Sequence, residues 1–211
     1  SARSMYIERS MLSLDGEILL SDGADYFVED PVRLLHIFFV AQVKNLRLSE
    51  EVKRTIQNSL YLMDDALRGS QEACAVFMRI LKRKTRVAKT LRSMHELGIL
   101  GAYLPEFGGL DCLVQYDIYH IYTVDEHTLV ALENLESLGG DQAPAMLAQA
   151  FAEFERKDLI YLSVLLHDVG KWKRQEHISC GVEMTKELVE RLSLPEDERR
   201  MWVWCSPLTQ K

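Results

Sequence analysis

The sequence lacks any apolar run of the length that a membrane-spanning helix needs, which is about 20 residues. Its first ten residues, "SARSMYIERS", lack the apolar stretch of a secretory signal peptide. They also do not begin with methionine, so we expect a piece of a longer protein. These absences predict a chain that neither crosses a membrane nor enters the secretory route.

Paired cysteines and an excess of basic residues are missing as well. The four cysteines are scattered, without a CxxC pair, which argues against a zinc ribbon or a disulfide framework and favours the reducing cytoplasm. A net charge of −7 argues against general affinity for nucleic acid. We therefore expect a cytoplasmic protein whose partners include neither nucleic acid nor a membrane.

What the sequence does contain is a helical hydrophobic period over most of its length. The 47% apolar content is enough for one large or two small cores in 211 residues. Only residues 5–20, "MYIERSMLSLDGEILL", resemble strands, and Asp15–Gly16 predicts the turn of a small hairpin. From Pro31 onward, apolar residues recur at a spacing of three or four. The expected fold class is all-α, with a small N-terminal β-hairpin.

Local signals divide the helical part into segments. Ser49 is a candidate N-cap for a helix over 49–67, and the helical pattern of 71–100 ends near Gly98 or Gly101. Residues 124–140, 145–171 and 181–204 also have helical periods. The stretch "LPEFGGL", residues 104–110, combines proline with two glycines and is the best candidate for a domain boundary.

The stretch "LLHDVGKWKRQEH", residues 165–177, contains the strongest functional signal. His167 and Asp168 end a strongly apolar segment, where ionisable groups need partners because an unpaired buried charge is costly. An imidazole next to a carboxylate suits Mn²⁺, Mg²⁺, Fe²⁺ or Zn²⁺. His127, on a core-directed helix, and His177, after the basic loop, are candidates for further ligands. A buried histidine is more often a hydrogen-bonded core residue, but this combination favours a divalent-metal pocket.

Two motifs resemble a known family. "LLHDVGK" resembles the signature of the HD superfamily of metal-dependent phosphohydrolases. The stretch "LRSMHELGILGAYLPEFGGLDCLVQYDIYHIYTVDEHTL", residues 91–129, resembles the bifunctional PII uridylyltransferase/uridylyl-removing enzymes of bacterial nitrogen regulation. The resemblance covers most of the chain and is weaker before residue 75. It implies a helical linker region over 1–105, followed by an HD-type helical bundle over 106–211.

By position, the resemblance implies that His127 is the first HD histidine, that His167 and Asp168 are the central pair, and that His177 matches a further family histidine. The chain ends with "CSPLTQK", before the last HD aspartate, so we expect a C-terminally incomplete domain. No Gly-Ser turn with paired carboxylates and no ACT-like pattern occurs. Uridylylation and the response to glutamine as effector, through ACT domains, are therefore expected to lie outside this chain.

The implied reaction is metal-dependent hydrolysis of UMP from a tyrosine of the uridylylated PII signal protein. The metal is expected to be Mn²⁺ or Mg²⁺, with Fe²⁺ or Zn²⁺ as alternatives. Besides His167 and Asp168, the catalytic candidates are Lys171, which would pair with phosphate oxygens, and Asp125, which would orient a histidine or act on the water. Lys171 can equally belong to a solvated basic loop, and Asp125 can be an exposed acid at a helix start. Two other functions stay open, namely another HD-superfamily nucleotide phosphohydrolase and a non-catalytic helical scaffold.

Overall fold

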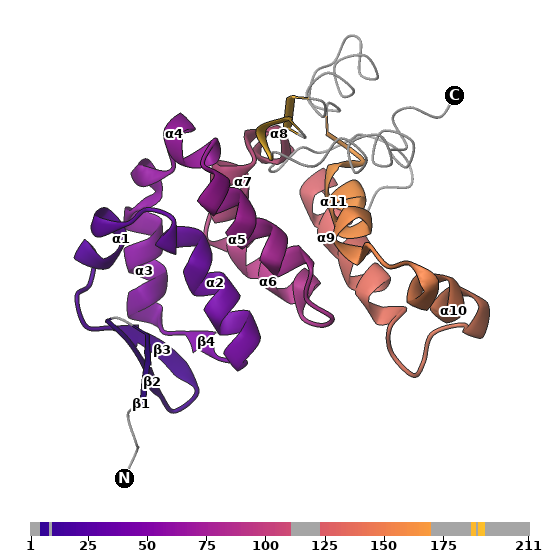
Figure 1. The fold of residues 1–211 in the computed structure, drawn as a ribbon, viewed down its shortest axis with the longest axis horizontal. Helices are drawn as coiled ribbons and strands as arrows, with labels where there is room; N and C mark the ends of the chain where they lie inside the picture. Colours follow the sequence, from indigo (N-terminus) through magenta and orange to yellow (C-terminus); the bar gives the residue numbers. More distant parts are fainter. Residues whose placement is uncertain (1–4, 9, 111–122, 170–186, 189, 193–211) are drawn as a thin grey trace.

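The computed structural model describes residues 5–8, 10–110, 123–169, 187–188 and 190–192. Within these ranges the chain is mainly helical, with a small sheet at the N-terminal end (Figure 1). The expected fold class is therefore confirmed. The β part is larger than a single hairpin, because the sheet has four strands in the order β1-β2-β3-β4.

The sheet consists of β1 (Met5–Glu8), β2 (Met11–Leu14), β3 (Glu17–Leu20) and β4 (Arg47–Leu48). The predicted hairpin is β2–β3: Asp15 (φ 50°) and Gly16 (φ 79°) form a two-residue turn, and positive φ at both positions suits the twist of an antiparallel pair. β4 pairs with β3 in parallel, with the Arg47 N–H donating to Gly16 O at 2.9 Å. A strand of two residues has no periodicity, so the sequence did not predict it.

The first helical part contains α1 to α8. In chain order these are α1 (Asp25–Glu29), α2 (Arg33–Lys44), α3 (Glu50–Asn58), the single turn η1 (Leu60–Leu62), α4 (Asp65–Arg68), α5 (Gln71–Leu81), α6 (Val87–Glu96), α7 (Ile99–Tyr103) and α8 (Pro105–Gly108). The Ser49 hydroxyl accepts the Val52 N–H, so the predicted N-cap of α3 is confirmed. Gly98, at φ 78°, separates α6 from α7, whereas Gly101 lies inside α7.

The second helical part contains α9 (Val124–Ser137), α10 (Ala145–Glu153) and α11 (Lys157–Leu166). α9 ends before Gly139–Gly140, the last residues of the helical segment predicted over 124–140. The helical segment expected over 145–171 is divided in two, because Phe154 adopts an extended conformation (φ −76°, ψ 109°) between α10 and α11. Gly170, and most of the helix expected over 181–204, lie outside the described residues.

One hydrophobic core runs through both helical parts. α2 packs on α5 and α6, α6 packs on α9, and α11 packs on α5, α8 and α9. α9 and α11 lie side by side, on the side of α5 and α6 that is away from the sheet (Figure 1). Leu104, Phe107 and Leu110 are fully buried where a domain boundary was predicted, and the division at residue 105 stays a prediction. In the described part of the chain, none of the helices combines the length and apolarity required to cross a membrane.

Candidate metal centre

His167 and Asp168 stand at the C-terminal end of α11, where a buried helix gives way to a turn. Five apolar side chains anchor the helix in the core: Leu159, Tyr161, Leu162, Leu165 and Leu166. His167 is the C-cap residue, and the N–H of the buried Val169 donates to Leu166 O at 3.1 Å. The last turn therefore brings two polar side chains to the edge of the core while its backbone remains hydrogen-bonded.

A backbone contact selects the tautomer of His167. Its Nδ1 lies 2.6 Å from Val164 O, and because a carbonyl oxygen only accepts, Nδ1 must carry the proton. In the neutral ring, Nε2 then has a free lone pair, which is the form that binds a metal. Nε2 lies 3.3 Å from Oδ2 of Asp168, whose side chain is 6% exposed. The ring is thus oriented by the protein before any ligand arrives.

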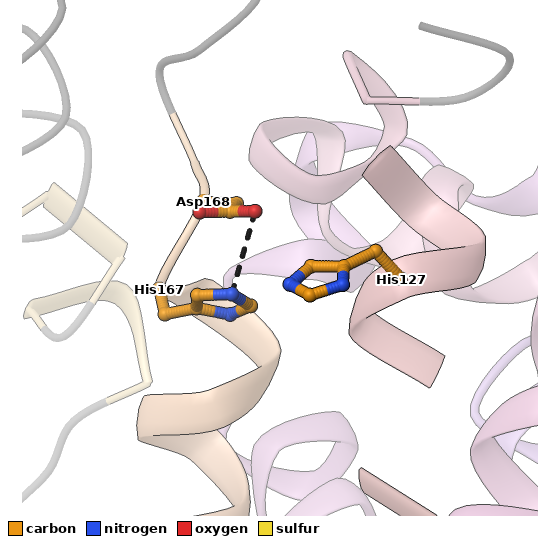
Figure 2. Close-up of side chains that lie close together, drawn as sticks. All are labelled: His127, His167 and Asp168. Carbon is orange, nitrogen blue, oxygen red and sulfur yellow. Dashed lines mark ion pairs between the residues drawn. The ribbon is translucent and has the colours of Figure 1, made fainter. Parts of the chain in front are cut away.

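His127 comes from the other side of the site, on the first turn of α9. Its ring centroid lies 5.6 Å from that of His167, with an angle of 54° between the rings. One ligand atom each from His127, His167 and Asp168 lies within 4.8 Å of the others. Figure 2 shows the two rings pointing toward each other, with the Asp168 carboxylate beside His167. Two segments that are forty residues apart in the sequence therefore meet in one cluster.

The donor set fits a divalent cation. Two imidazoles and one carboxylate are ligands that Mn²⁺, Fe²⁺ and Zn²⁺ accept, and Mg²⁺ accepts the carboxylate with water. Ligand atoms that each lie about 2.1 Å from one ion are separated by about 3 to 4 Å. The separations of up to 4.8 Å are wider than in a formed site, so the three side chains would have to move closer together to bind one ion.

Asp125 takes a different partner from the one expected of a catalytic acid. Its carboxylate is buried, and Oδ2 lies 3.1 Å from Nε2 of His95 on α6. Burial opposes its charge, but hydrogen bonds from the Thr123 hydroxyl and the Glu126 N–H, with the charge of His95, lower its pKa below the ordinary value. The predicted role of orienting a histidine thus has a geometric counterpart in His95, a residue that the sequence analysis did not select.

Other polar contacts between α6 and α9 were also not predicted. The Arg92 guanidinium donates to Glu126 at 2.9 Å and to Glu133 at 2.6 Å. These two hydrogen bonds raise the pKa of Arg92, despite its partial burial. Near the other end of α9, Glu136 accepts the Val87 N–H at 2.7 Å. The spacing of Glu126 and Glu133 put them on one face of a helix, but nothing in the sequence identified α6 as the partner.

Two of the predicted site residues, Lys171 and His177, lie outside the described residues, and their roles stay predictions. The structure brings His127, His167 and Asp168 together. It places Asp125, two residues before His127 on α9, against His95. The candidate centre therefore consists of three side chains from α9 and the end of α11.

Comparisons with known proteins bear on the family of the chain. Residues 13–103 match the family model described as "Uridylyltransferase GlnD third domain". The chain is 33% identical over 194 residues to the bifunctional uridylyltransferase/uridylyl-removing enzyme of Novosphingobium aromaticivorans, covering 90% of this chain and 21% of that protein. It is 37% identical over 181 residues to the enzyme of the same name from Methylococcus capsulatus, covering 82% and 20%.

Solved structures show a similar fold at low identity. A tRNA-processing enzyme in apo form has a TM-score of 0.61 and 20% identity, covering 90% of this chain and 42% of that chain. At this identity the likeness concerns the fold alone. The curated relatives are more informative, and the chain spans about a fifth of their length. Over most of its length, the chain belongs to the family of bifunctional uridylyltransferase/uridylyl-removing enzymes.

Proposed function

We propose that His127, His167 and Asp168 form the metal site of a phosphodiesterase that removes UMP from a tyrosine of the uridylylated PII signal protein. One observation carries this proposal: three side chains of metal-binding type, one from α9 and two from the end of α11, lie within 4.8 Å of one another. The words "uridylyl-removing" in the names of the relatives, and the resemblance of "LLHDVGK" to the HD phosphohydrolases, support it.

The residues suit hydrolysis of an aryl phosphodiester. A divalent cation, Mn²⁺ or Mg²⁺ by preference, supplies Lewis-acid chemistry when bound, lowering the pKa of water and polarising a phosphoryl oxygen. Water oxygen forms the new bond to phosphorus, the bond from phosphorus to the tyrosyl oxygen breaks, and UMP and the free phenol result. A tyrosinate, with a pKa of about 10, leaves more readily than an alkoxide. A strong general acid is therefore less necessary.

Each described residue has a defined part in this proposal. The Val164 carbonyl keeps the proton on Nδ1 of His167, so that Nε2 faces the cluster. Asp168 supplies a buried negative charge, which offsets that of a cation. His177 is proposed as a further ligand and Lys171 as a phosphate contact. Asp125, which faces His95, is proposed to act by orienting α9 and not on the water.

The experiment compares both reactions in one preparation of the full-length protein. His167→Ala and Asp168→Asn should abolish release of UMP from uridylylated PII while uridylylation of PII continues. His36→Ala is the matched control, because His36 pairs with Glu8 at the sheet, away from the cluster. Calorimetric titration with Mn²⁺ should detect a site in the wild type that both site variants lose. Retained UMP release in either variant would refute the proposal.

The same measurements, with an added assay of free nucleotides as substrates, test the two alternatives. Hydrolysis of free nucleotides without release of UMP from PII would favour another HD-type nucleotide phosphohydrolase. Absence of both Mn²⁺ uptake and hydrolysis would favour a helical scaffold. Regulation by glutamine is proposed to act through ACT domains outside this chain.

A further inference from the structure

α9, which carries His127, is held by polar contacts from α6 along its length. Arg92 bridges Glu126 and Glu133, which are seven positions apart and therefore lie about two turns apart on one face of α9. His95 contacts Asp125 near the start of the helix, and the Val87 N–H contacts Glu136 near its end. We call the Arg92–Glu126–Glu133 contact the α6–α9 clasp.

The clasp constrains the rotation of α9 about its own axis. The hydrophobic effect is non-directional, whereas the two hydrogen bonds of Arg92 are directional and oppose rotation of α9. Cα atoms lie about 2.3 Å from a helix axis, so a rotation of about 20° moves each by about 0.8 Å, and side-chain tips by more. Functional sites tolerate displacements of about 0.5 Å. Because Glu126 directly precedes His127, a rotation that the clasp prevents would move His127 out of place.

We propose that Arg92 is a positioning residue for the metal centre, which it serves by fixing the rotation of α9 and hence the distance from His127 to His167. The inference rests on the proposed function of the three-residue cluster. It also assigns a role to the helical region that matches the third-domain family model, since α6 lies within residues 13–103. That region is then part of the scaffold of the hydrolytic site.

The solvent exposure of the clasp argues against a purely stabilising role for Arg92. The side chains of Arg92, Glu126 and Glu133 are 27%, 35% and 44% exposed, so the ion pairs themselves contribute little to stability. Arg33 offers a matched control. It also contacts two carboxylates, Glu29 at 3.3 Å and Asp30 at 3.5 Å, but it lies on α2 near the sheet. Arg33 also donates to Tyr26 O at 2.9 Å and lies over the Tyr26 ring, so its loss removes at least as many contacts as loss of Arg92. Only Arg92 contacts the residue that precedes His127.

The test uses Arg92→Ala, Arg92→Lys and Arg33→Ala in the full-length protein. Mn²⁺ affinity is measured by calorimetry, and kcat and KM are measured for UMP release. Arg92→Ala should lower Mn²⁺ affinity and kcat by about 10-fold, with KM unchanged, as loss of a group that orients a metal ligand does. Arg92→Lys should be intermediate, because an ammonium lacks the planar fork that reaches both carboxylates. Arg33→Ala should match the wild type. The inference is overturned if Arg92→Ala matches the wild type, or if Arg33→Ala loses as much.

A second variant and a metal-free measurement complete the test. Should Arg92→Ala not fold, Glu133→Ala removes one arm of the clasp and should still weaken Mn²⁺ binding; unchanged binding would overturn the inference. Nuclear Overhauser contacts between the rings of His127 and His167 report their approach without metal. They should be present in the wild type and lost in Arg92→Ala. If the wild type binds no Mn²⁺ and releases no UMP, the proposed function fails, and these ring contacts alone decide the positioning role.

Discussion

Gly108→Ala should destabilise the protein, although alanine is the better helix former. α7 and α8 meet at Gly101 and Gly108, where a Cβ on Gly108 would lie 2.8 Å from the Gly101 carbonyl oxygen and 3.1 Å from its Cα. Both atoms belong to the backbone, so no side-chain rotation relieves the overlap. α8 also packs on α11, and separating α7 from α8 therefore disturbs the helix that ends at His167.

The two opposing contributions can be compared in size. Replacing glycine by alanine inside a helix is worth about 0.5–1 kcal/mol in favour of alanine. Overpacking a tight contact typically costs about 1–3 kcal/mol and occasionally more. Since both neighbours of the new methyl group are backbone atoms, the cost should lie at the upper end. We expect Gly108→Ala to lower the free energy of unfolding by about 1–2 kcal/mol net.

Gly69→Ala is the control with the opposite expected sign. Gly69 is exposed at the end of α4, at φ −86°, and a Cβ there would have no neighbour closer than 3.4 Å. Its alanine variant should gain about 0.4–1 kcal/mol, because the unfolded chain loses conformational freedom. Urea denaturation at constant m-value measures both changes. Equal or greater stability of Gly108→Ala would refute the packing argument.

Three further predictions concern buried polar groups. The Tyr103 hydroxyl has no hydrogen-bond partner among the described residues, so Tyr103→Phe should leave the free energy of unfolding unchanged or raise it by about 1 kcal/mol in urea titrations. Asp158 is 2% exposed and accepts two hydrogen bonds from Arg156, at 3.0 and 2.8 Å, so Asp158→Asn should lower stability by about 1.5–3 kcal/mol, seen as a lower Tm. Burial raises the pKa of Tyr26 to about 12, and it also raises the pKa values of Tyr103 and Tyr161. The unfolded chain, with tyrosine pKa values of about 10, loses these protons first, so stability should be complete below pH 10 and fall as the pH rises toward 12. A flat urea midpoint across that range would contradict this prediction.

Local chemistry explains which elements could be predicted from the sequence. Asp15–Gly16 and Ser49 encode a turn and a cap through contacts within a few residues, and both predictions are confirmed. The break between α10 and α11 was not predicted, because "FAEFERKD" contains neither proline nor glycine to mark it. β4 was missed for a related reason: two residues have no period, and only their pairing with β3 makes them a strand.

Sequence patterns were enough to predict the helical class, the hairpin, and which imidazole and carboxylate groups are chemically suited to a metal. That His127 meets His167 and Asp168, that Asp125 faces His95, and that α6 holds α9 through Arg92 became evident from the folded chain alone. The difference lies in distance along the chain. Turns and caps depend on neighbouring residues, whereas a site built from α6, α9 and α11 depends on how a shared apolar core packs the three helices together.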